Sequence, residues 1–156
     1  MKSRIRTYLA FIALTTCLIQ SQENPDRPNI VFFLVDDLGW TDLGCYGSNF
    51  YETPNIDSFA MDGVKFNNAY AACHVCSPTR SSILTGKYPA RNKMTDWIRG
   101  RRDFPFQQYL NVKTGQFLPF EEVTRAEKLR SHGYATGAVG KWTGRREPST
   151  PDKQGF

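Results

Sequence analysis

Residues 29–37 read NIVFFLVDD, and this stretch decides the fold. Residues 29–35 form a nearly continuous apolar run in which polar and apolar side chains do not alternate. A run of this kind is typical of a strand that is buried on both faces of a parallel sheet. The run stops at two carboxylates, Asp36 and Asp37, and Gly39 then permits an irregular loop. We therefore expect a buried strand that delivers two acidic side chains to its carboxyl end.

Helix and strand signals alternate along the rest of the chain. Each expected helix starts or stops at a proline or glycine signal typical of a helix end. The predicted elements are helices over residues 54–61, 78–85 and 123–132, strands over residues 64–70 and 135–139, and a long loop over residues 94–118. This alternation predicts an α/β fold with a mixed or parallel sheet flanked by helices. Lys141 follows the last strand as Asp36 follows the first, so both are expected at the edge where such sheets bind ligands.

The composition fits a folded domain. Of the 156 residues, 40% are hydrophobic and 22% are charged, so a packed core is expected and wholesale disorder is not. The net charge is +5, but Lys2, Arg4 and Arg6 supply three of the positive charges in a basic leader. The charge is therefore poor evidence for nucleic-acid binding, and we expect no nucleic-acid partner.

A second basic feature lies at Arg99, Arg101 and Arg102. Charge runs are usually solvated faces, so a solvated loop is the first interpretation of this cluster and an anion-binding patch the second. Trp97 and the other two tryptophans are expected to pack rather than to serve as sugar platforms.

The leader is typical of a secretory signal. Its basic start precedes an apolar run from Tyr8 to Ile19, which is too short for a transmembrane helix. The expected organisation is a signal peptide over residues 1–21, a linker over residues 22–28 and a folded part over residues 29–156. We expect export to the periplasm or the extracellular space, with no stable membrane insertion after cleavage. An uncleaved anchor and lipidation at Cys17 remain alternatives.

Asp36 and Asp37 are candidate metal ligands. Adjacent carboxylates at a strand end suit a hard divalent cation, which prefers oxygen ligands. Successive residues of a strand point to opposite faces, so the chain must bend before both can reach one ion. Taken alone, the pair is more typical of an ordinary loop position.

Cys76 is the candidate nucleophile. It lies at the predicted start of a helix, where unpaired backbone N–H groups and the positive end of the helix dipole favour an anion. Arg80 follows one helical turn later on the same face, and its planar guanidinium suits an oxygen near residue 76.

Other chemistry for Cys76 stays open. A thiol hydrolase would need an activating histidine, and neither His74 nor His132 has a suggestive spacing. With Cys73 it forms a C-x-x-C pair, which suggests redox or zinc chemistry, but the sequence holds no second such pair.

The stretch from Cys76 onward carries a resemblance. Residues 76–91 read CSPTRSSILTGKYPAR, which is similar to the signature of the type I, formylglycine-dependent sulfatases, C-x-P-x-R followed by a leucine-threonine-glycine turn. Further stretches that resemble the family are residues 28–40, 51–57, 118–136 and 140–142. The resemblance implies the N-terminal part of an arylsulfatase-like catalytic domain with the alkaline-phosphatase-like sulfatase fold. Its implied activity is hydrolysis of sulfate esters.

The resemblance also implies a maturation step. A formylglycine-generating enzyme would read Cys76, Pro78 and Arg80 and convert Cys76 to formylglycine. One hydroxyl of the hydrated aldehyde would attack sulfur and expel the alcohol, and the other would then eliminate sulfate.

Roles for the other site residues follow from the same resemblance. Asp36 and Asp37 would ligate Ca²⁺, or less often Mg²⁺, together with residue 76. Arg80 would steady the hydrated aldehyde, and Lys141 would neutralise charge on the sulfate. The implied substrate is a sulfate ester, and export together with the family's habits favours sulfated polysaccharide.

Two departures from the family pattern bear on the expected activity. Gly140-Lys141-Trp142 is followed by Thr143, where the family has a histidine. The family's downstream metal ligands, second lysine and second histidine are not in this chain, so we expect a fragment or a degraded copy that is inactive by itself. The alternatives are a phosphonate or phosphodiester hydrolase of the same superfamily and a non-catalytic fragment.

Overall fold

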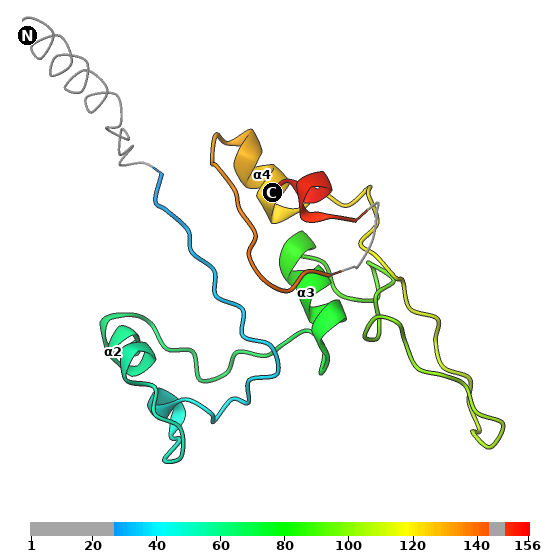
Figure 1. Cartoon of the computed structure of the whole chain (residues 1–156), viewed down its shortest axis with the longest axis horizontal. Helices are drawn as coiled ribbons and strands as arrows, with labels where there is room; N and C mark the ends of the chain where they lie inside the picture. The colour runs from blue at the N-terminus through cyan, green and yellow to red at the C-terminus, as the bar shows by residue number, and fades with distance from the viewer. Residues whose placement is uncertain (1–26, 144–148) are drawn as a thin grey trace, which may run out of the picture. The chain divides into compact units, whose positions relative to one another are not determined.

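The computed structural model describes residues 27–143 and 149–156. The chain divides after Leu34 into two units, and residues 27–34 are the described part of the first. The described helices of the second unit are η1 (Gly44–Tyr46), α2 (Pro54–Asp62), α3 (Cys76–Thr85), α4 (Arg125–Ser131) and η2 (Pro151–Gln154) (Figure 1). Within these described stretches, none of the helices combines the length and the apolar character of a membrane span. The expected signal peptide lies outside the described residues.

Helix α2 begins where the sequence predicts, and its first turn also holds η1. The Thr53 hydroxyl accepts a hydrogen bond from the backbone N–H of Gly44 (2.8 Å) and donates one to Asp57 (3.0 Å). The Asp57 carboxylate in turn accepts from the backbone N–H of Cys45 (2.6 Å). Two polar side chains at the helix start therefore satisfy backbone groups of the preceding loop.

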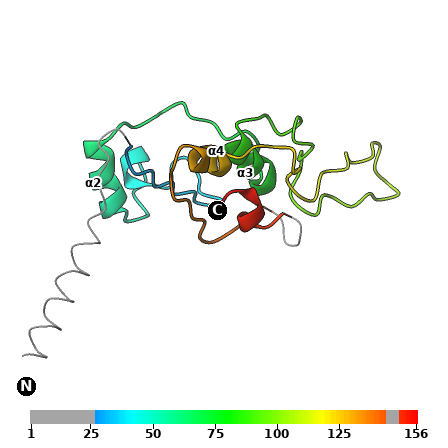
Figure 2. The same cartoon turned by 90° about the horizontal axis from the view of Figure 1, so that it is seen from above.

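Helices α3 and α4 lie side by side in both views (Figures 1 and 2). The buried apolar residues nearby are Met94, Leu118 and Ala126. Asn92 is also fully buried, and its side-chain amide donates to the hydroxyls of Thr85 (2.9 Å) and Ser81 (3.4 Å) on α3. Gly86 ends α3 in the left-handed conformation, as its position in the sequence predicts. The loop predicted over residues 94–118 is irregular throughout.

Helix α4 starts with a capping box that the apolar periodicity did not indicate. The Thr124 hydroxyl accepts from the backbone N–H of Glu127 (3.1 Å), and the Glu127 carboxylate accepts from the backbone N–H of Thr124 (2.7 Å). The same hydroxyl donates to the carbonyl of Gln154 (2.7 Å), which fastens η2 to this helix. Val123, which was predicted to lie on the helix, precedes it and is exposed.

The predicted strands are not formed in the described residues. Residues 29–35, 64–70 and 135–139 have no strand assignment, and Phe33 and Val139 are 87% and 104% exposed. A strand needs a neighbour that takes up its backbone N–H and C=O groups, and no described segment pairs with these three. Their apolar character is that of buried strands, but this structure contains no sheet around them.

Candidate active site

Cys76 is the first residue of α3, which begins two residues earlier than expected. Val75 precedes it in extended conformation and has no polar side chain to cap the helix. The loop ahead of the helix is fixed by Thr79, whose hydroxyl accepts from the backbone N–H of Cys73 (3.1 Å) and donates to the Cys73 carbonyl (2.8 Å). The first backbone N–H groups of α3 therefore remain available to an anion beside residue 76.

Three of the predicted site residues come together next to this helix. The Asp36 carboxylate accepts a hydrogen bond from Arg80 Nη2 (3.1 Å) and another from Lys141 Nζ. Arg80 Nη1 donates to the backbone carbonyl of Lys141 (2.9 Å). The Nε–H of Arg80 is buried and has no partner among the described residues, so it remains available to an oxygen ligand. Asp36 thus joins two of the predicted site residues, Arg80, expected beside the hydrated aldehyde, and Lys141, expected at the sulfate.

The charges of this cluster reinforce one another. The hydrogen bond from Lys141 is the main cause that lowers the pKa of Asp36, Arg80 lowers it further, and desolvation opposes both. The hydrogen bond to Asp36 raises the pKa of Lys141, and the negative form of Cys76 adds to that shift. Both groups are therefore charged near neutral pH, and Lys141 carries its positive charge within electrostatic reach of Cys76.

Asp37 provides the bend that two neighbouring carboxylates need. Its φ of 56° lies in the left-handed region, so the turn occurs at Asp37 itself. The oxygen donors of Asp36 and Asp37 fit a hard divalent cation. Among residues 27–143 and 149–156, however, no group of three or more His, Cys, Asp or Glu side chains gathers to hold a metal. The metal-binding role of Asp36 and Asp37 therefore stays a prediction.

The histidines are engaged away from Cys76. His74 Nδ1 lies 3.7 Å from Cys73 Sγ, and its Nε2 lies 3.4 Å from Arg101 Nη2. His132 follows α4, where its Nδ1 lies 2.8 Å from the carbonyl of Lys128. In the described part of the chain neither ring hydrogen-bonds Cys76, so the geometry offers no base for a thiol hydrolase.

The cysteines form no disulfide among the described residues, and the predicted packing of the tryptophans holds for Trp142 but not for Trp40. Cys45, Cys73 and Cys76 are all free thiols. Trp142 packs as predicted, edge-on against Phe156 with its N–H donated to the carbonyl of Ser149 (2.8 Å). Trp40, by contrast, is 78% exposed.

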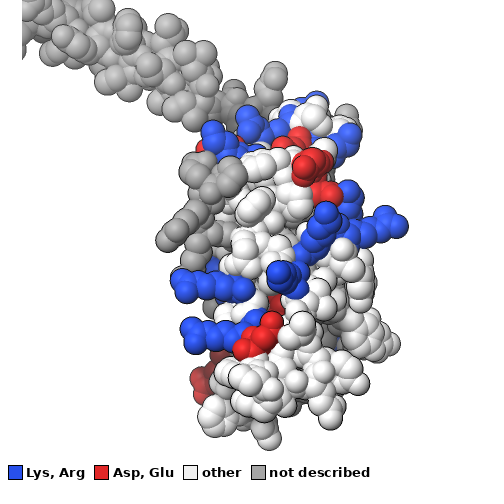
Figure 3. All heavy atoms as spheres, turned by 90° about the vertical axis from the view of Figure 1, so that its right-hand side faces the viewer, with Lys and Arg blue, Asp and Glu red and all other residues white. Residues whose placement is uncertain are grey.

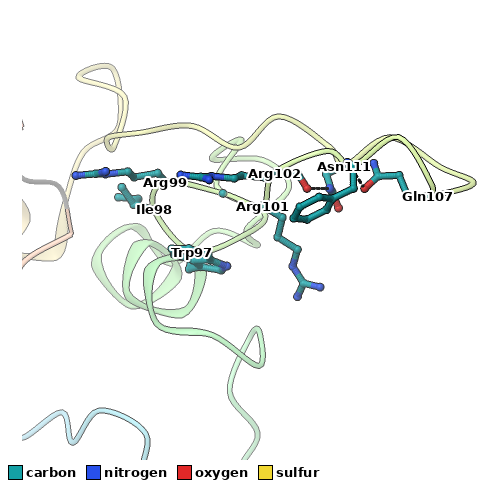
Figure 4. A pocket seen from close by; sticks show the side chains of 9 residues that line it. Trp97, Ile98, Arg99, Arg101, Arg102, Gln107 and Asn111 are labelled. Carbon is teal, nitrogen blue, oxygen red and sulfur yellow. Dashed lines mark hydrogen bonds between the residues drawn. The ribbon is translucent and has the colours of Figure 1, made fainter.

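The predicted loop also forms a groove of about 840 Å³, which sequence reasoning did not foresee (Figure 4). Its lining includes Trp97, Arg99, Arg101, Arg102, Phe104 and Asn111. The loop is anchored to α3, because the backbone N–H of Ile98 donates to the Ser77 hydroxyl (3.2 Å). The basic cluster was the one signal in the sequence for this feature.

The comparison with protein families decides the assignment. The family model described as Sulfatase matches residues 28–156. The chain belongs to the sulfatase family. Human steryl-sulfatase is 41% identical over 116 residues, which cover 74% of this chain and 19% of that protein. Human arylsulfatase D is 43% identical over 131 residues, which cover 84% of this chain and 21% of that protein. This sulfatase chain thus spans about a fifth of the length of these relatives.

A solved structure agrees with the predicted fold class. Ps i-CgsB in complex with k-i-k-neocarrahexaose is 33% identical, with a TM-score of 0.62 over 78% of this chain and 25% of that one. The α/β, alkaline-phosphatase-like sulfatase fold is therefore confirmed for this chain, although its described residues form no sheet.

Proposed function

We propose that the protein carrying this sulfatase chain hydrolyses sulfate esters, with residue 76 as the nucleophile. The observation that carries the proposal is the cluster of Asp36, Arg80 and Lys141 beside the start of α3. Two cations and a set of uncapped backbone N–H groups suit the oxygens of a sulfate group. Curated relatives with sulfatase names favour this reaction over phosphonate hydrolysis.

The nucleophile would arise from Cys76 by maturation. A formylglycine-generating enzyme would oxidise this thiol in the context of Pro78 and Arg80. Addition of water to the formylglycine aldehyde would give a geminal diol, whose hydroxyl would be the nucleophile in place of the thiol. Cys76 is part-exposed and its thiol is free, which supports access of a maturation enzyme to this side chain.

The side chains around residue 76 would bind and orient the sulfate. Lys141 would hold one sulfate oxygen through its ammonium group, and the buried Nε–H of Arg80 would hold an oxygen at residue 76. Asp36 would keep both cations in place. Asp36 and Asp37 would hold Ca²⁺ or Mg²⁺, which when bound would supply positive charge to the sulfate oxygens.

We propose that the protein is exported from the cytoplasm and that its substrates are sulfated sugars. The basic leader and its short apolar run support export with cleavage after residue 21. The similar structure in complex with k-i-k-neocarrahexaose supports a saccharide substrate class.

The test uses the full-length protein, co-expressed with a formylglycine-generating enzyme. Tryptic peptide mass should show loss of the Cys76 thiol, and an aryl sulfate should be hydrolysed faster than the matched aryl phosphate. Cys76→Ala should abolish turnover, whereas Cys45→Ala, which removes another free thiol, should leave it unchanged. An unmodified Cys76, with the maturation enzyme active on a control peptide, would contradict the proposal.

A further inference from the structure

We propose that the groove of residues 97–111 is a second anion subsite, which holds a further sulfate group of a polysulfated saccharide. The inference rests on the proposed function, because it assumes a sulfate ester at residue 76. The groove lies on a separate loop from the residues that would bind that first sulfate. Figure 4 shows Arg99 and Arg102 extended along the same rim.

Two of the three arginines of the groove form no ion pair within the described residues. Arg101 pairs with Asp96 (3.0 Å) and approaches His74. Within residues 27–143 and 149–156, no ion pair joins Arg99 or Arg102 to an acidic side chain, and both are exposed. On the side of the molecule shown in Figure 3, several Lys and Arg side chains project into solvent. An anion that enters the groove therefore does not have to displace a carboxylate from these two guanidinium groups.

The acidic residue of the loop is held by amides instead. Asp103 Oδ1 accepts from the side chain of Gln107 (2.7 Å) and from the backbone N–H of Asn111 (2.8 Å). The Asn111 side chain also donates to Asp103 (3.0 Å) and to the backbone carbonyl of Arg102 (3.0 Å). These bonds fix the backbone that carries Arg102, and they occupy the charged Asp103 carboxylate with amide donors rather than with an arginine. The loop is thereby preorganised, and within the described residues the guanidinium groups of Arg99 and Arg102 remain free of ion pairs.

The groove also connects to the candidate active site. The bond between the Ile98 amide and the Ser77 hydroxyl ties the groove to the residue that follows Cys76. Trp97 and Phe104 line the groove and are 43% and 51% exposed. Planar guanidinium groups suit sulfate, and exposed aromatic rings suit the apolar faces of a sugar ring. A polysulfated saccharide that places one sulfate at residue 76 fits this combination better than a simple aryl sulfate does.

The test compares two pairs of basic residues in the full-length protein with Cys76→Ala, so that no turnover occurs. Sulfated dextran is titrated by calorimetry, with unsulfated dextran of the same length as the reference. Arg99→Ala/Arg102→Ala should weaken binding about tenfold. Lys128→Ala/Arg130→Ala, which removes two exposed cations from α4, should weaken it less than twofold. Arg99→Gln repeats the test if the double variant does not fold.

Kinetics on the matured protein separate this inference from the proposed function. With Cys76 intact, Arg99→Ala/Arg102→Ala should keep its rate on an aryl sulfate and raise KM for a polysulfated oligosaccharide. Background rates on aryl sulfate in all forms would overturn the proposed function and leave the binding result to stand. Unchanged binding of sulfated dextran by the double variant would overturn the subsite, and so would an equal loss of affinity for a single-stranded oligonucleotide, because that would mark a general polyanion patch.

Discussion

Asp36 and Arg80 are joined by a hydrogen bond of 3.1 Å although they lie 44 residues apart in the sequence. Asp36 follows the apolar run that was predicted as a strand, and Arg80 lies on the second turn of α3. The bond therefore connects the candidate metal ligand to the candidate nucleophile helix. Because Arg80 also donates to the carbonyl of Lys141, one guanidinium group links three separate parts of the site.

Arg80→Lys should cost the full-length, matured enzyme about 10²-fold or more in kcat/KM on an aryl sulfate. A lysine cannot donate from two nitrogens in the fixed geometry by which Arg80 reaches both Asp36 and the Lys141 carbonyl. Steady-state kinetics check this, with Arg91→Lys as the matched exposed control. A rate within twofold of the unmodified enzyme would show that the linkage is dispensable.

Asn92→Ala should lower the free energy of unfolding by about 1–3 kcal/mol. The substitution removes a buried amide and leaves the hydroxyls of Ser81 and Thr85 without its hydrogen bonds. Urea unfolding of the full-length protein measures the change, beside Asn67→Ala at an exposed position. Equal stability of the two variants would mean that solvent replaces the Asn92 bonds at no cost.

Thr124→Ala should destabilise the protein by about 1 kcal/mol, because it removes half of the capping box on α4 and the bond to the Gln154 carbonyl. Thr124→Ser keeps the hydroxyl and should recover most of the loss. Thermal unfolding and amide hydrogen exchange in residues 125–131 provide the measurements. The prediction fails if the serine variant is as unstable as the alanine variant.

The order of the groove loop should depend on the ionisation of Asp103. The backbone hydrogen bond from Asn111 is the main cause that lowers the pKa of Asp103, and the side chain of Gln107 adds to it. A carboxyl with a lowered folded pKa stabilises the fold above its unfolded pKa of about 4, and this contribution is lost as pH falls through the folded value. The amide resonance of Asn111 should therefore stay constant from neutral pH to about pH 4 and shift only below it.

Asp103→Asn gives the control for this pH dependence. It removes the charge at every pH, so the Asn111 amide should be displaced already at pH 7 and should no longer titrate. If the unmodified protein showed its Asn111 shift centred above the ordinary carboxyl pKa, the hydrogen bonds to the charged form would not be present in solution.

The helix ends were predictable from the sequence because their causes are local. Thr53-Pro54 and Gly86 lie within a few residues of the helix ends they set, and they have the same effect in any surrounding. The capping box of Thr124 and Glu127 was equally readable as T-x-x-E, but the apolar periodicity placed the helix start two residues too early.

The strands were not predictable in the same way. The apolar run at residues 29–35 indicates side chains that a strand would bury. Strand pairing, however, depends on backbone groups that another segment must provide.

The candidate site was predictable only in part. The pattern of strands and helices predicted that Asp36 and Lys141 would lie at one edge, and the family resemblance added Arg80 to the site. Neither indicated that Asp36 would accept hydrogen bonds from both cations. The groove depended on the Ile98–Ser77 bond, which joins positions 21 residues apart and has no sequence signature.

Because the backbone at Asp37 is left-handed, substitutions at this position can distinguish the conformational role of the residue from the role of its carboxylate charge. Asparagine and glycine adopt such a conformation readily, whereas β-branched residues resist it. In a library that samples every amino acid at position 37, selection for folded protein should retain asparagine and glycine and remove valine and isoleucine. Selection for turnover should then remove asparagine and glycine as well. Some residues should pass the first selection and fail the second. They show how far the contribution of Asp37 to turnover depends on its negative charge rather than on its backbone conformation.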